Sequence, residues 1–166
     1  MPSIQMSGRP IFEVVQQTGY IVATLMYAIT TEVMEKICHV LEKEELAERY
    51  RDLHQKIAEA FRGEYILEDH TISKNYQGVY VLALQANVLS EEECQMAIYQ
   101  LVHLIRENET RLDTGFLSVN YLLPVLAANG EKNLANEILF QDKCPSWLYE
   151  VKMGATTMWE YWNGYA

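Results

Sequence analysis

The chain has 166 residues, a net charge of −10 at pH 7 and 49% hydrophobic residues. This length and hydrophobic content predict a single folded domain with a core of its own. The acidic balance disfavours nucleic acid and anionic membranes as partners, because both attract clustered Lys and Arg side chains. The cysteines Cys38, Cys94 and Cys144 lack C-x-x-C spacing, so we expect reduced thiols rather than a disulfide framework or a zinc knuckle.

Residues 1–19 contain Pro2, Gly8 and Pro10, and they predict an irregular lead-in to the first helix. They lack the basic region and apolar run of a secretory signal. The apolar run at residues 21–29 is too short to span a membrane. We therefore expect a soluble protein, with a cytoplasmic location favoured.

Helical periodicity dominates the rest of the chain. Apolar residues spaced by three and four place a single stripe on residues 44–61, made up of Leu46, Tyr50, Leu53, Ile57, Ala60 and Phe61. Ser90 followed by Glu93 forms a capping box at the start of another helix. The predicted helices span residues 20–41, 44–61, 75–89, 90–108, 117–128 and 131–140.

Nearly all-apolar helices alternate with amphipathic ones in this order, and the connections between them are short. The pattern is typical of an all-α fold of antiparallel helical hairpins, with the more apolar members on the inside. The connection at residues 63–74 is charged, with Glu64, Glu68, Asp69 and His70. It is open to two interpretations, a solvated connector or a functional loop.

Several kinds of chemistry have no motif in this sequence. The four histidines do not form H-x-x-x-H or H-E-x-x-H pairs, and the glycines do not form a phosphate-binding loop. No serine lies in G-x-S-x-G. We therefore expect no metal, no nucleotide and no cofactor.

The three tryptophans, Trp147, Trp159 and Trp162, all lie within the last twenty residues. Aromatic rings interleaved with carboxyl and amide groups suit a site that stacks on a sugar and bonds its hydroxyls. Glu160 is flanked by Trp159 and Tyr161. It is either a carboxyl in an aromatic pocket, as glycoside hydrolysis requires, or an ordinary Glu that caps an element end.

Four ordered segments resemble the bacterial α-L-rhamnosidases, glycoside hydrolase family 78. The first three are Y-I-V-A-T at residues 20–24, Q-G-V-Y-V-L-A-L at residues 77–84, and T-G-F at residues 114–116 with L-L-P-V-L at residues 122–126. The most specific is the tail, P-S-W-L-Y at residues 145–149 followed by G-A-T-T-M-W-E-Y-W at residues 154–162. The tail is similar to the family's P-S-W-x-Y…G-A-T-T-x-W-E-R-W signature.

This resemblance implies part of an (α/α)6 barrel of six helical hairpins and the hydrolysis of terminal α-L-rhamnose with inversion. It implies that Glu160 is the general base. It also implies that Trp147, Trp159, Trp162 and Thr157 line or support the pocket for a rhamnose-containing carbohydrate or glycoside.

The family's general acid precedes the resembled region, and residues 1–19 hold no equivalent. We therefore expect residues 1–166 to form one partial catalytic-domain segment. Its uncovered inner helices would expose apolar surface and favour self-association. A non-catalytic helical module that binds carbohydrate or another chain is the main alternative, and a helical repeat protein is a weaker one because no fixed period is present.

Overall fold

The computed structural model describes residues 5–6, 9–159 and 161–164. These residues form two short antiparallel strands, β1 (Gln5–Met6) and β2 (Arg9–Pro10), and seven helices. The helices are α1 (Ile11–Val40), α2 (Glu44–Tyr65), α3 (Gln77–Gln85), α4 (Glu91–Glu107), α5 (Val119–Ala128), α6 (Lys132–Leu139) and α7 (Trp147–Lys152). The prediction of an all-α fold is confirmed.

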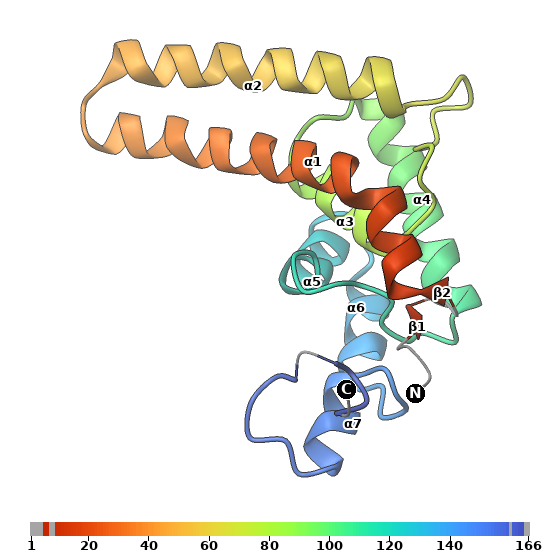
Figure 1. The fold of residues 1–166 in the computed structure, drawn as a ribbon. Helices are drawn as coiled ribbons and strands as arrows, with labels where there is room; N and C mark the ends of the chain where they lie inside the picture. The colour runs from red at the N-terminus through yellow and green to blue at the C-terminus, as the bar shows by residue number, and fades with distance from the viewer. Residues whose placement is uncertain (1–4, 7–8, 160, 165–166) are drawn as a thin grey trace.

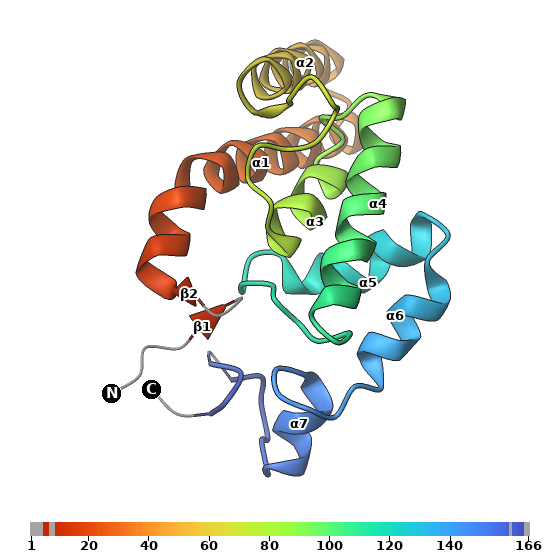
Figure 2. The same cartoon turned by 90° about the vertical axis from the view of Figure 1, so that its right-hand side faces the viewer.

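The first six helices pair into three antiparallel hairpins, α1 with α2, α3 with α4, and α5 with α6. Helix α3 also packs against both α1 and α5, so α1, α3 and α5 form one row. The partners α2, α4 and α6 lie outside that row, and α7 lies at the opposite end of the molecule from α2 (Figures 1 and 2). This two-row arrangement is that of consecutive hairpins in an α/α barrel.

The core is centred on α3, whose residues Val79 to Ala83 are all buried. Gly78 permits a close approach on the side of α5, because a Cβ atom there would lie 2.8 Å from Ser118 Oγ. The largest fully buried side chains come from six of the helices and one loop, and they are Ile21, Leu25, Phe61, Tyr80, Leu82, Leu101, Ile105, Leu112, Leu122, Leu126, Leu134 and Ile138. The core therefore lies between the inner row of α1, α3 and α5 and the outer helices α2, α4 and α6.

Helix α4 begins where the sequence predicts. Ser90 Oγ accepts a hydrogen bond from Glu93 N at 3.3 Å, and Glu93 Oε2 accepts one from Ser90 N at 2.7 Å. Both bonds use backbone N–H groups that have no partner inside the helix. The predicted capping box is thus confirmed.

The predicted stripe on α2 is only partly buried. Ile57 and Phe61 are buried, whereas Leu46 and Ala60 are exposed. Ala47, which the stripe did not include, is fully buried. The reason is that α2 packs mainly against the single helix α1, which covers a narrower face than the stripe.

The predicted irregular lead-in at residues 1–19 is wrong from Ile11 onward, because α1 begins there. Gly19 lies inside the helix, and an interior glycine costs only about 1 kcal/mol. Burial of Val14, Thr18 and Ile21 on one face of α1 outweighs this cost. Thr18 Oγ1 also donates to Val14 O at 2.6 Å, a bond that often bends a helix, and α1 bends in this first part (Figure 2).

One further boundary and one further helix differ from the predictions. Helix α3 is shorter than the predicted residues 75–89, and beyond its end Asn87 takes a positive φ of 53°. Helix α7 was not predicted, so the described residues hold seven helices rather than six. Its start depends on Ser146, whose buried Oγ accepts from Tyr149 N at 3.1 Å.

Candidate active site

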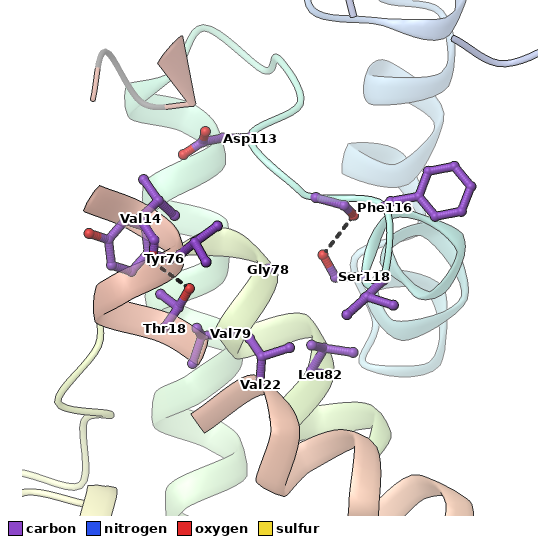
Figure 3. Close-up of a pocket in the computed structure, with 13 residues that line it drawn as sticks. Val14, Thr18, Val22, Tyr76, Gly78, Val79, Leu82, Asp113, Phe116 and Ser118 are labelled. Atoms are coloured by element: carbon purple, nitrogen blue, oxygen red, sulfur yellow. Dashed lines mark hydrogen bonds between the residues drawn. The ribbon is translucent and has the colours of Figure 1, made fainter. Parts of the chain in front are cut away.

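Three of the four family-like segments meet at one apolar pocket between α1, α3 and the segment before α5. Val22 comes from the first, Gly78, Val79 and Leu82 come from the second, and Phe116 comes from the third. Figure 3 shows these residues on the three parts of the chain, with the Phe116 ring directed away from the others. Three segments that are far apart in the sequence and that resemble the family therefore lie close together in the structure.

The pocket offers few polar groups. The hydroxyls of Thr18 and Ser118 donate to backbone carbonyls of Val14 and Gly115. Asp113 lies at the edge of the pocket (Figure 3), and its backbone N–H donates to Gln77 Oε1 at 3.1 Å. Sequence reasoning did not single out Asp113, although it directly precedes the T-G-F segment.

The tail attaches to the other side of the T-G-F segment. Trp162 Nε1 donates to Thr114 O at 3.4 Å, and Leu112 N donates to Pro145 O at 3.2 Å. Thr114 is fully buried at this junction, and its Oγ1 has no hydrogen-bond partner among the described residues. Residues 112–116 therefore connect the apolar pocket to the tail.

The structure brings two of the three predicted tryptophans into direct contact. The rings of Trp147 and Trp162 meet edge to face, with centroids 6.1 Å apart and planes at 79°. Both rings are half-buried and pack against the hydrophobic core. Trp147 and Trp162 therefore form an aromatic pair that fixes the tail to the helical body.

Trp159 and Thr157 lie apart from that pair. The Trp159 ring is half-buried and packs on Gly164, and Thr157 is exposed. Glu160, the predicted general base, lies outside the described residues. The described part of the tail therefore gives the positions of its neighbours Trp159 and Tyr161, and the role of Glu160 stays a prediction.

The packing of Trp159 on Gly164 leads to a testable prediction. Gly164 has a φ of +74°, and an added Cβ would collide with the six-membered ring of Trp159. We expect Gly164→Ala to displace this ring and shift tryptophan emission, in addition to a backbone cost of about 1–2 kcal/mol for the positive φ. Gly130→Ala is the matched control, since Gly130 lies beyond the end of α5 and has a φ of +89° but no heavy atom within 4 Å of an added Cβ. Equal emission from the two variants would contradict this packing.

Glu150 is the buried carboxyl that sequence reasoning missed. It lies on α7 and its residue surface is only 3% exposed. Its Oε2 accepts a hydrogen bond from Trp159 N at 3.4 Å, and its Oε1 has no hydrogen-bond partner among the described residues. Burial raises the pKa of the Glu150 carboxyl above its usual value, and the bond from Trp159 opposes this.

Glu150 is separated from Trp147 by three positions, so the two lie on the same side of the short helix. The three-residue spacing from Trp147 could have identified Glu150 as a candidate site residue. However, its burial depends on the chain returning nine residues later at Trp159, which no local pattern indicates.

The described part of the chain holds no disulfide and no candidate metal site. The three cysteines are free, and no cluster of three or more His, Cys, Asp or Glu side chains within the described ranges could hold a metal ion. Among the helices of residues 11–152, none is long and apolar enough to cross a membrane.

Comparisons with known proteins agree on one family. The bacterial alpha-L-rhamnosidase six-hairpin glycosidase domain matches residues 9–166. An alpha-L-rhamnosidase of Alteromonas sp. (strain LOR) is 36% identical over 148 residues, which are 88% of this chain and 16% of that protein. One of Formosa agariphila is 36% identical over 150 residues, with the same shares of the two chains.

A solved structure shows the same fold. The crystal structure of Streptomyces avermitilis alpha-L-rhamnosidase complexed with L-rhamnose superposes with a TM-score of 0.81 and 35% sequence identity. The superposition covers 86% of this chain and 14% of that chain. The three hairpins and the tail that packs on them therefore define a helical-hairpin glycosidase domain.

Within that class, the chain belongs to the bacterial α-L-rhamnosidase six-hairpin glycosidase domain family. It spans 16% of the length of the curated relatives from Alteromonas and Formosa.

Proposed function

We propose that the chain contributes the general-base side of an inverting α-L-rhamnosidase site, with Glu160 as the base. In this reaction a carboxylate removes a proton from water as the water attacks the anomeric carbon, and the sugar–oxygen bond breaks on the opposite face. A second carboxyl group about 6.5–9.5 Å away protonates the departing oxygen. No cofactor or metal takes part in this chemistry.

The observation that carries the proposal is the docking of the tail on the T-G-F segment. Trp162 is anchored through its indole N–H to Thr114 and through its ring to Trp147. Trp159 is anchored through its backbone to Glu150. Two anchored tryptophans therefore precede Glu160 by one position and follow it by two positions in the sequence, and catalysis benefits from a base held in one geometry.

The proposed substrate is a glycoside that ends in α-L-rhamnose. The relative from Streptomyces avermitilis was crystallised with L-rhamnose. Rhamnose carries a methyl group on an otherwise hydroxylated ring, and indole faces suit such a mixed surface. In this proposal Trp159 and exposed Thr157 contact the sugar, while Trp147 and Trp162 support the wall behind them.

The experiment measures release of 2,4-dinitrophenol from its α-L-rhamnoside together with binding of free rhamnose to the same 166-residue chain. This phenol is acidic enough to leave without protonation, so the assay isolates the general base. Turnover with rhamnose binding supports the proposal. Binding without turnover favours the alternative, a non-catalytic carbohydrate-binding module, and the absence of both contradicts the two functions alike.

We also propose that the chain, as one partial-domain segment of residues 1–166, self-associates through an apolar face. Val15, Phe116 and Leu117 are 59%, 73% and 51% exposed, and all three line the apolar pocket. We expect concentration-dependent association in sedimentation velocity and binding of a hydrophobic dye. The double variant Val15→Ser, Phe116→Ser should reduce both, whereas Phe140→Ser, at an exposed site beyond α6, should not. A stable monomer that binds no dye would contradict this proposal.

A further inference from the structure

The segment that leads to Glu160 is a turn over residues 154–159, held at both of its ends by one residue of α7. At its start, Ala155 N donates to Glu150 O at 3.0 Å and Gly154 N donates to Val151 O at 3.0 Å. Gly154 has a φ of +88°. These two bonds with a left-handed glycine form a Schellman motif, which terminates α7 and begins the turn.

At the other end of the turn, the side chain of the same residue takes part. Glu150 Oε2 accepts from Trp159 N at 3.4 Å. Within the turn Thr156, Thr157 and Met158 are exposed, so the described body does not cover it. The carbonyl and the carboxyl group of Glu150 therefore hold the first and last parts of an otherwise exposed turn.

The burial of Glu150 is unusual for such a side chain. Carboxyl groups are seldom buried unless they are paired, and leaving one oxygen without a partner costs free energy. Glu150 is 3% exposed, and its Oε1 has no partner among the described residues. A hydrophobic residue at this buried position would avoid that cost, so a positioning role accounts for a carboxyl group here better than a packing role does.

We propose that Glu150 is a positioning residue for the rhamnosidase reaction, because its carboxyl group fixes the Trp159 amide and with it the adjoining residue Glu160. This inference rests on the proposed role of Glu160. In this proposal Glu150 must supply an acceptor oxygen, and its side chain must be long enough to bring that oxygen to the Trp159 N–H. Gln keeps both that length and an acceptor oxygen, whereas Ala keeps neither.

The first test follows the Trp159 amide by NMR in the 166-residue chain labelled with ¹⁵N-tryptophan. Only three backbone amide signals arise, and Trp→Phe variants assign them. We expect hydrogen exchange at Trp159 to accelerate at least about fivefold in Glu150→Ala and to remain near the wild-type rate in Glu150→Gln. Unchanged exchange in Glu150→Ala, or equal acceleration in Glu150→Gln, would overturn the proposal.

Two controls separate this role from general loss of structure. Ser146→Ala removes the cap of α7 and should affect the Trp147 end of the helix first. Glu64→Ala removes an exposed carboxylate from α2, at the other end of the molecule (Figure 1), and should leave all three signals unchanged. Faster Trp159 exchange in Ser146→Ala equal to that in Glu150→Ala would show that the helix, not the carboxyl group, holds the turn, and would overturn the proposal.

The second test uses turnover of the 2,4-dinitrophenyl α-L-rhamnoside. We expect Glu150→Ala to lower kcat by about 10- to 100-fold with KM nearly unchanged, and Glu150→Gln to restore most of it. A normal kcat in Glu150→Ala would overturn the positioning role. If the wild-type chain shows no turnover, the proposed function fails, and the exchange measurement alone then decides whether Glu150 holds the turn.

Discussion

Glu160→Gln is expected to lower turnover of the 2,4-dinitrophenyl α-L-rhamnoside by about 10²- to 10⁴-fold, the usual contribution of a positioned acid or base. Gln keeps the size and hydrogen-bonding capacity of the side chain but cannot accept the proton of the attacking water. Rhamnose binding should therefore change little. Steady-state kinetics and a binding titration on the same samples measure the two effects.

A chemical rescue separates loss of the base from loss of the pocket. Azide attacks the anomeric carbon without giving up a proton, so it needs no general base. Azide should raise substrate consumption by Glu160→Ala and have little effect on the wild-type chain. Full activity in Glu160→Gln would contradict the assignment of the base, and failure of rescue with lost rhamnose binding would indicate a damaged pocket.

Leu101→Ala is expected to lower the free energy of unfolding by about 2–5 kcal/mol, the range for large-to-small changes in a well-packed core. Leu101 is fully buried on the inner face of α4, the helix that packs against α3. Tyr99→Ala on the same helix is the matched control, because Tyr99 is 65% exposed. Urea unfolding measures both, and equal losses would contradict the assignment of the inner face of α4.

The fold was largely predictable because helical periodicity and caps are local signals. The pair Ser90 and Glu93 fixed the start of α4, and apolar helices alternating with amphipathic ones indicated the two rows. The start of α1 was missed because Gly19 and Pro10 suggested an interruption. Burial against the other helices outweighs the local preference of Gly19, and that burial cannot be seen in a local pattern.

The candidate site was less predictable. The concentration of tryptophans in the tail indicated where to look, but not that Trp147 would pair with Trp162 while Trp159 packs on Gly164. These contacts depend on a chain reversal between α7 and the last residues. Glu150 was missed for the same reason, since its environment is created by residues that follow it after a turn.

The assignment of Glu160 as the general base is tested most directly by the identity of the first sugar anomer that the chain releases from 2,4-dinitrophenyl α-L-rhamnoside, followed by ¹H NMR. We expect β-L-rhamnose to appear first and then to convert slowly to the equilibrium mixture, because Glu160 activates water on the face opposite the leaving group. Initial release of α-L-rhamnose, or release unaffected by Glu160→Gln, would contradict this assignment.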